Sequence, residues 1–102
     1  FAKELKRLAK RYRSLKTDVK LLGESLQENP YQGADLGNGL RKVRMSVTSK
    51  GKGKSGGARV ITFTAIIATD TTEILLLTIY DKSERDNITD SELKALRLKC
   101  GI

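Results

Sequence analysis

The stretch Leu40–Ile67, LRKVRMSVTSKGKGKSGGARVITFTAII, predicts two β-strands joined by a long loop. In Leu40–Val47, apolar residues alternate with polar ones, so that Lys42 and Arg44 share the polar face of a half-buried strand. The segment Arg59–Ile67 is rich in β-branched residues, which favour strands. A β-hairpin with cations on one face is therefore the centre of the expected fold.

The loop between these strands, SKGKGKSGGAR, contains four basic residues, four glycines and no acid. Its GKS sequence at Gly53–Ser55 is not a P-loop, because Thr48 stands where that motif needs a glycine and because a strand follows instead of a helix. Its composition alone leaves three interpretations open, which are a phosphate-binding loop, a nucleic-acid contact and a mobile hairpin tip.

The residues after this hairpin predict one more strand and a short helix. Glu73–Tyr80, EILLLTIY, is apolar on both faces, as in a central strand, and Thr69–Thr72 is expected to form the preceding turn. Thr89 and Glu92 have the spacing of a capping box. The expected apolar face of this helix consists of Leu93, Leu96 and possibly Ile88.

The first 26 residues carry a helical stripe of apolar side chains. Its spacing alternates between four and three residues, from Phe1 to Leu26. Potential N-cap residues, Ser14, Thr17 and Asp18, interrupt it and favour a helical hairpin over one long helix. The segment ENPYQGADLGNG that follows is expected to be a loop.

Together these segments predict an α+β fold, in which a helical hairpin packs on an antiparallel β-sheet with a short C-terminal helix. The element order is α-α-β-β-β-α, and the length predicts one domain over residues 1–102.

The net charge of +8 is concentrated in two segments. Residues 1–22 contain eight Lys or Arg and two acids, and residues 40–60 contain seven Lys or Arg and no acid. The remaining residues carry a net charge of −5, so the pattern favours a localised polyanion site.

The composition excludes several classes of catalytic site. The chain has no histidine and one cysteine, Cys100, so His-based triads and zinc sites are excluded and a reducing, cytoplasmic location is expected. Asp81, Glu84 and Asp86 could bind magnesium, but acids at a helix entry usually favour the helix dipole instead. We expect no metal, no cofactor, and neither a membrane span nor a signal peptide.

Clustered Lys and Arg side chains can nevertheless act on RNA. They bind phosphate and stabilise the additional negative charge of a pentacoordinate phosphorus. RNA supplies its own nucleophile, the 2′-OH, so Lys42, Arg44, Arg59 and Lys82 form a candidate site. The simpler alternative is a basic patch that binds RNA without cleaving it.

Two segments, GLRKVRMSVTSKGKGKSGGARVITF and LLLTIYDKSERDNITDSE, resemble the RelE/ParE toxin superfamily, and most closely its HigB-type branch. The resemblance covers roughly residues 1–96. It implies a RelE-like fold, although the chain starts inside the first helix and lacks the short strand that usually precedes it. It also implies a ribosome-dependent mRNA interferase that cleaves by 2′-OH attack and leaves a 2′,3′-cyclic phosphate.

The resemblance assigns candidate roles to individual residues. Arg44 and Arg59, the latter within GAR, would hold the scissile phosphate, and Lys82 or Glu84 would transfer protons. Lys42, Lys50, Lys52 and Lys54 would bind the RNA backbone. The resemblance thus implies that the glycine-rich loop is a polyanion-binding hairpin tip, disordered or variable in the free protein. Ser83 stands where RelE has an arginine, and Thr89 lies near the position of its terminal aromatic residue.

The implied partners are mRNA, the ribosomal A site and a cognate helix-turn-helix antitoxin, which would mediate any contact with operator DNA. Two other functions remain open at this stage. One is a ParE-like toxin that poisons DNA gyrase, and the other is a non-catalytic RNA- or ribosome-binding module.

Overall fold

A computed structural model describes residues 1–68 and 71–102. Side chains are described for residues 1–65 and 71–102. The expected turn at Thr69–Thr72 therefore falls partly outside the described residues. Within the described residues, no helix is long and apolar enough to cross a bilayer.

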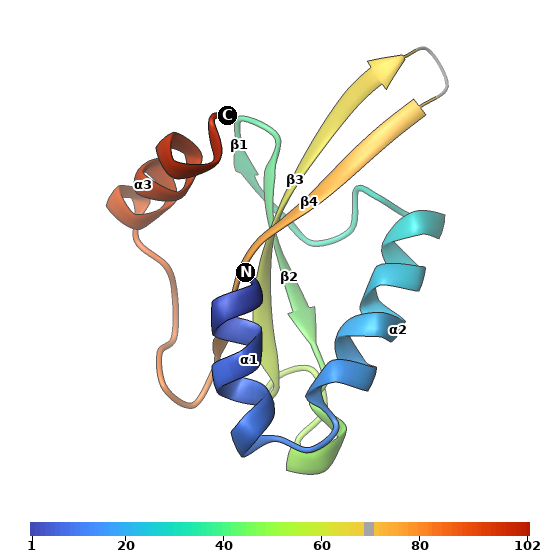
Figure 1. Ribbon diagram of the computed structural model, residues 1–102, viewed down its shortest axis with the longest axis vertical. Helices are drawn as coiled ribbons and strands as arrows, with labels where there is room; N and C mark the ends of the chain where they lie inside the picture. The colour runs from blue at the N-terminus through green and yellow to red at the C-terminus, as the bar shows by residue number, and fades with distance from the viewer. Residues whose placement is uncertain (69–70) are drawn as a thin grey trace.

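The centre of the fold is an antiparallel sheet in which neighbouring strands are consecutive in the chain (Figure 1). This arrangement confirms the predicted α+β class. Its strands are β1 (Ala34–Gly37), β2 (Leu40–Met45), β3 (Ala58–Ala68) and β4 (Thr71–Asp81).

The predicted helical hairpin is confirmed as α1 (Ala2–Arg11) and α2 (Leu15–Glu28), which cover one face of the sheet (Figure 1). The apolar stripe of the sequence is the buried side of both helices. Its fully buried members pack with β2, β3 and β4 in one core, which includes Leu8, Leu15, Leu22, Leu26, Val43, Met45, Val60 and Ile79.

The C-terminal helix α3 (Asp90–Cys100) packs on the opposite face of the sheet. Thr89 accepts a hydrogen bond from the Glu92 amide, and the Glu92 side chain accepts one from the Thr89 amide, which confirms the capping box. Ile88 and Leu93 are buried in a second core, with Leu96 partly buried against it. Both faces of the sheet are thus covered by helices.

One strand was missed in the sequence, because β1 lies within the segment expected to be a loop. It has only four residues, and backbone pairing with β2 defines it more than side-chain burial does. The turn between them places Asn38 at φ 56° and Gly39 at φ 79°. Asn-Gly is a strong signal for a tight hairpin turn and could have revealed the strand.

The expected central position of Glu73–Tyr80 was wrong, because β4 is the outer strand of the described sheet. Its apolar side chains on both faces reflect burial by helices, not neighbours on both edges. A shift in the β3–β4 register near Leu77 also changes which face of the sheet the successive side chains of β4 occupy. Leu76 and Ile79 pack in the first core, whereas Leu77 and Tyr80 pack in the second.

Candidate nucleic-acid interface

The strand register brings predicted cations together on the sheet face that also carries α3. Arg44 of β2 lies directly opposite Arg59 of β3, and Arg59 lies opposite Tyr80 of β4. Lys42 is two residues before Arg44, so its side chain leaves the strand on the same face. The predicted proximity of Lys42, Arg44 and Arg59 is therefore confirmed by the pairing.

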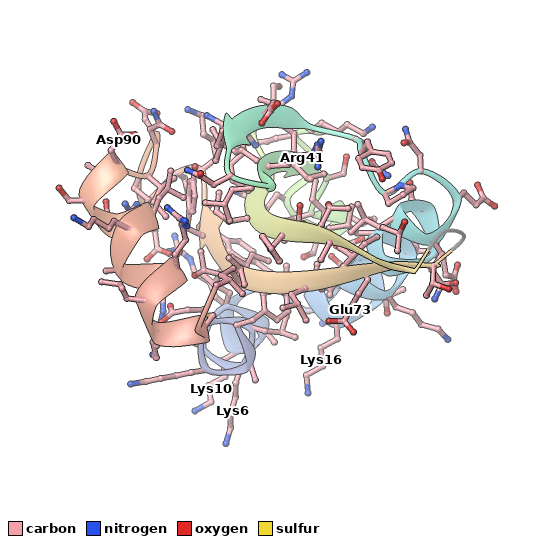
Figure 2. The ribbon with its side chains drawn as sticks, turned by 90° about the horizontal axis from the view of Figure 1, so that it is seen from above. Lys6, Lys10, Lys16, Arg41, Glu73 and Asp90 are labelled. Atoms are coloured by element: carbon pink, nitrogen blue, oxygen red, sulfur yellow. The ribbon has the colours of Figure 1, made fainter. Side chains whose placement is uncertain are left out.

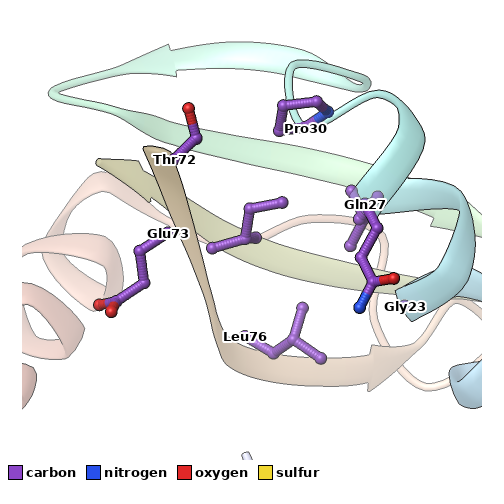
Figure 3. A pocket seen from close by; sticks show the side chains of 8 residues that line it. Gly23, Gln27, Pro30, Thr72, Glu73 and Leu76 are labelled. Atoms are coloured by element: carbon purple, nitrogen blue, oxygen red, sulfur yellow. The ribbon is translucent and has the colours of Figure 1, made fainter. Parts of the chain in front are cut away.

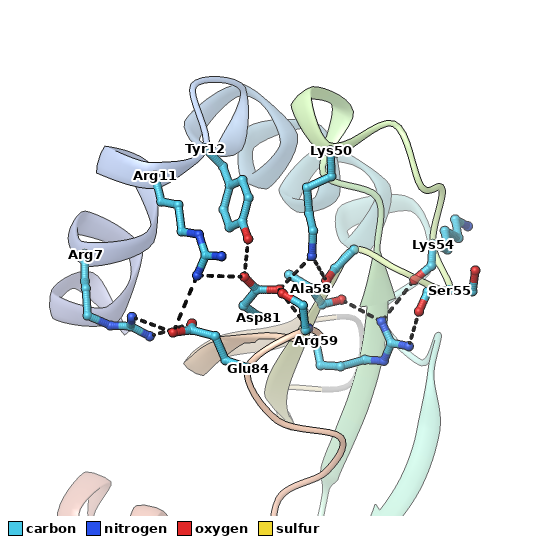
Figure 4. A network of polar contacts seen from close by, with 12 residues as sticks. Arg7, Arg11, Tyr12, Lys50, Lys54, Ser55, Ala58, Arg59, Asp81 and Glu84 are labelled. Carbon is cyan, nitrogen blue, oxygen red and sulfur yellow. Dashed lines mark hydrogen bonds and ion pairs between the residues drawn. The ribbon is translucent and has the colours of Figure 1, made fainter.

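Arg59 points into the protein, and its side chain organises the loop that precedes it (Figure 4). Only 5% of its surface is exposed. Its guanidinium donates hydrogen bonds to the carbonyl oxygens of Lys54 (3.0 Å), Ser55 (3.1 Å) and Ala58 (3.1 Å). In this arrangement Arg59 holds the loop backbone in place, and it does not pair with Asp81 or Glu84.

The glycine-rich loop (residues 48–57) is attached to the rest of the fold at its start. The buried carboxylate of Asp18 accepts hydrogen bonds from the Thr48 amide at 2.9 Å and the Thr48 hydroxyl at 2.7 Å. The Ser49 amide donates to the Ser14 hydroxyl at 2.8 Å. Thr48 and Ser49 belong to a 3-10 turn, η1 (Thr48–Lys50). The expectation of a disordered or variable loop was wrong at this end, because the side chains of Ser14, just before α2, and Asp18, within α2, bind its backbone.

Lys50 does not project toward solvent, because its ammonium group pairs with the buried carboxylate of Asp81 at 2.7 Å (Figure 4). Asp81 also accepts hydrogen bonds from the Tyr12 hydroxyl and from the amide and hydroxyl of Ser83. Burial raises the pKa of Asp81, but the hydrogen bonds from Lys50, Tyr12 and Ser83 outweigh it and lower that pKa well below its ordinary value. Sequence reasoning missed this polar centre.

The remaining loop lysines and the polar strand residues are accessible. Lys52, Lys54 and Arg44 are exposed, and Lys42 is half-buried with its ammonium 3.1 Å from the Asn87 side-chain oxygen. Lys42, Arg44 and Lys54 line one surface pocket. We call Lys42, Arg44, Lys54 and the adjoining Arg59 the basic sheet face.

Lys82 and Glu84 lie on the segment that leads from β4 to α3. The Lys82 amide donates to the Gly57 carbonyl, which ties this segment to the end of the glycine-rich loop. Its ammonium group pairs with Asp86 at 2.8 Å and lowers the pKa of that carboxyl. Glu84 instead accepts two hydrogen bonds from Arg7 of α1, each 3.2 Å long. Arg11 of α1 lies 3.9 Å from both Asp81 and Glu84, so these two acids share a cation, whereas Asp86 pairs with Lys82.

Tyr80 lies beside the basic sheet face, directly opposite Arg59. It is buried, but its hydroxyl has no hydrogen-bond partner among the described residues. Burial raises the pKa of Tyr80, and the positive charges of Arg59 and Arg85 partly offset this effect. The Arg85 guanidinium lies 5.2 Å from the centre of the ring.

Arg85 is held in place by α3. It pairs with Glu92 at 2.5 Å, and together with the Thr89 amide it lowers the pKa of Glu92 to about 2. The capping box thus also positions a cation over Tyr80. Sequence spacing alone gives no signal for this contact, because it depends on how the preceding loop folds back.

A separate pocket lies between the C-terminal half of α2 and the start of β4 (Figure 3). Leu26, Ile74 and Leu76 contribute apolar side chains, and Glu73 contributes an acidic one. Because its lining has no cation, this pocket is not part of the basic interface.

The accessible cations can bind a phosphodiester group, and hydrogen bonds from guanidinium groups suit its oxygens. Among known families, the model described as the RelE toxin of the RelE / RelB toxin-antitoxin system matches residues 2–101. No solved structure matches the chain.

Proposed function

Because the chain belongs to the RelE toxin family of toxin–antitoxin systems, we propose that it is a ribosome-dependent endoribonuclease that cleaves mRNA in the A site. Membership makes the protein a toxin and implies an antitoxin as its partner. The HigB-type branch, the helix-turn-helix antitoxin, the site of cleavage and a cytoplasmic location are part of this proposal.

The observation that carries the proposal is the pairing of Arg44 with Arg59 on one sheet face, next to Lys42 and Lys54. Several cations at one pocket provide the positive charge that a phosphodiester needs as it becomes pentacoordinate. Arg44 is exposed and can contact the scissile phosphate directly. Lys42, Lys52 and Lys54 would contact phosphates on either side of it.

The proposed reaction uses only groups of the RNA and of this chain. The 2′-oxygen attacks the adjacent phosphorus, a 2′-O–P bond forms, and the P–O5′ bond breaks. The products are a 2′,3′-cyclic phosphate and a 5′-hydroxyl. One proton leaves the 2′-OH, and another reaches the departing 5′-oxygen.

Lys82 is the better of the two proton-transfer candidates. It follows β4 and is tied to the glycine-rich loop, whereas Glu84 faces Arg7 and Arg11 of α1. We propose that Lys82 exchanges its partner Asp86 for RNA when substrate binds. Arg59, already bound to three carbonyl groups, would act by holding the loop in position, and Lys50 by its ion pair with Asp81.

Primer extension on mRNA, with purified protein added in the presence and absence of ribosomes, tests the proposal. We expect cuts in register with codons only when ribosomes are present. If neither cleavage nor inhibition of translation occurs, the ribonuclease proposal fails. A gyrase assay and an RNA-binding assay would then separate the other two functions.

A further inference from the structure

The segment that connects β4 to α3, residues 82–89, contains neither helix nor strand and reaches back to the basic sheet face (Figure 1). We call residues 82–89 the strap. Its first amide, that of Lys82, donates to the Gly57 carbonyl at 3.1 Å. At its other end, Ile88 is buried in the second core and Thr89 caps α3. Both ends of the strap are therefore fixed, and its middle stays close to the proposed site.

The middle of the strap contacts two lysines that the proposed reaction uses. The Lys82 ammonium group donates to the Asp86 carboxylate at 2.8 Å and to the Asp86 carbonyl oxygen at 3.3 Å. The Lys42 ammonium group donates to the Asn87 side-chain oxygen at 3.1 Å. A phosphate group of RNA would offer oxygen acceptors to the same two ammonium groups. The strap and an RNA phosphate therefore compete for Lys42 and Lys82.

The contacts of the strap with these lysines are of a kind that a phosphate can displace. The Asp86 side chain is 90% exposed and that of Lys82 is 30% exposed, so water and salt screen their ion pair. Asn87 is also exposed, and its amide offers Lys42 a neutral acceptor. A phosphodiester carries a full negative charge, and hydrogen bonds between ionised groups are stronger than those to neutral acceptors.

Arg85 holds the strap in this closed conformation. Its guanidinium donates two hydrogen bonds to the Asn87 carbonyl oxygen, each 3.1 Å long, and pairs with Glu92 of α3 at 2.5 Å. The backbone at Asn87 is thereby tied to α3 through side chains that do not contact the basic sheet face. The position of Asp86 and Asn87 over the lysines is thus built into the free protein.

Tyr80 provides a feature that disfavours the closed strap. Its ring lies under the Arg85 guanidinium and packs in the same core as Ile88. The hydroxyl is buried without a hydrogen-bond partner among the described residues. A buried hydroxyl that loses its bonds to water destabilises the conformation that buries it. Opening of the strap would return this hydroxyl to water.

We propose that the strap is autoinhibitory, with Asp86 and Asn87 occupying Lys82 and Lys42 in the free protein until an RNA phosphate displaces them. Because Asp86 and Asn87 are adjacent, opening of the strap releases both ammonium groups together. The use of the two lysines in RNA cleavage rests on the proposed function, whereas closure of the strap over them does not.

The test compares two double variants that each lose one carboxylate and one amide. Asp86→Ala/Asn87→Ala is the strap variant, and Glu24→Ala/Gln27→Ala changes two exposed side chains of α2 as the control. A third variant, Tyr80→Phe, removes the unpartnered hydroxyl. The probe is a short single-stranded oligodeoxynucleotide, which offers phosphates but has no 2′-OH to be attacked. Fluorescence anisotropy measures its affinity, and circular dichroism establishes that the variants are folded.

We expect the strap variant to bind the oligodeoxynucleotide about threefold to tenfold more tightly than the parent, because two competing contacts are lost. The control variant should remain within about twofold of the parent, since its lost charge acts only at long range. Tyr80→Phe should bind about threefold more weakly, because its closed strap no longer buries an unpaired hydroxyl. Equal affinities of the strap and control variants, or a Tyr80→Phe variant that binds no more weakly than the parent, would overturn the proposal.

This binding test is independent of catalysis. If the strap variant gains affinity but neither it nor the parent cuts mRNA on ribosomes, the autoinhibitory strap stands and the ribonuclease function fails. If the parent cuts mRNA but the strap variant binds the oligodeoxynucleotide like the control, only the strap proposal fails. Where both hold, the strap variant should also cut mRNA faster than the control variant at limiting protein concentration.

Discussion

At the scale of single residues, the candidate site depends on two polar centres that organise the glycine-rich loop from within. Arg59 binds the carbonyl groups at the end of the loop, and the Lys50–Asp81 pair holds its beginning. Both centres consist of charged side chains that are buried in the protein. The loop lysines that face solvent, Lys52 and Lys54, are thereby displayed on a defined backbone.

Replacing Arg59 with alanine should lower the free energy of unfolding by about 3 kcal/mol, because one buried and two partly buried carbonyl groups lose their charged donor. Arg59→Lys should lie between the parent and the alanine variant, because one ammonium cannot bind all three carbonyl oxygens in the same geometry. Urea denaturation measures both values. Hydrogen exchange should be faster at the amides of residues 54–57, and unchanged stability and exchange in Arg59→Ala would refute the positioning role.

Asp81 should make the free energy of unfolding depend on pH in the acidic range. Its pKa is lower in the folded protein than in the unfolded chain, where it is about 3.9. As the pH falls, the unfolded chain therefore binds a proton at this carboxylate before the folded protein does. The stabilisation by Asp81 is complete above about pH 4 and is lost as the pH falls toward the folded-state pKa.

Asp81→Asn tests this assignment. The variant should be about 3 kcal/mol less stable at neutral pH, because Lys50 stays buried without its counter-charge. Its stability should then change less than that of the parent between about pH 4 and pH 2. Denaturant midpoints across this range provide the comparison, and parallel pH profiles would show that another carboxylate dominates.

The sequence revealed which cations share a sheet face, but not which of them reach solvent. Alternation places Lys42 and Arg44 together, and the hairpin places Arg59 opposite Arg44. The inward orientation of Arg59 depends on carbonyl groups that converge only when the loop is folded. Likewise, the pairing of Lys50 with Asp81 joins positions 31 residues apart, beyond the reach of a local pattern.

At the scale of elements, apolar periodicity and capping signals predicted the helical hairpin, the β2–β3 pair and the start of α3. Short β1 was missed because its pairing depends on a tight turn and not on side-chain patterning. The outer position of β4 could not be read from its composition, because two layers of helices bury both of its faces.

Two glycines give a matched test of these elements. Gly57→Ala should destabilise the protein, because the new Cβ would lie 2.0 Å from the Met45 carbonyl oxygen. Gly23→Ala in α2 should stabilise it by about 0.5–1 kcal/mol, since beyond the adjacent backbone of its own helix no atom lies within 4 Å of the added methyl group and alanine favours helix. Thermal unfolding of both variants should show shifts of opposite sign, and shifts of the same sign would contradict this geometry.

At the scale of the whole molecule, the two basic segments of the sequence form two surfaces separated by the sheet. Lys6, Lys10 and Lys16 project from the outer side of α1 and α2 (Figure 2), and the strand register places Lys42, Arg44 and Arg59 on the sheet face that carries α3. The radius of gyration, 13.3 Å, is close to the value of about 13 Å for a compact domain of this length. We propose that residues 1–102 form one domain.

The most direct test of the proposed active face compares two arginines of β2. Arg44 belongs to the basic sheet face, whereas Arg41 points to the other side of the strand and lies 4.9 Å from the Tyr31 ring centre. The measurement is the rate of mRNA cleavage on ribosomes by the Arg44→Gln and Arg41→Gln variants. Melting temperatures equal to that of the parent establish that both variants are folded. We expect Arg44→Gln to be slower by about 10²-fold and Arg41→Gln to remain within about threefold of the parent. Equal rates for the two variants would contradict the assignment of RNA cleavage to the basic sheet face.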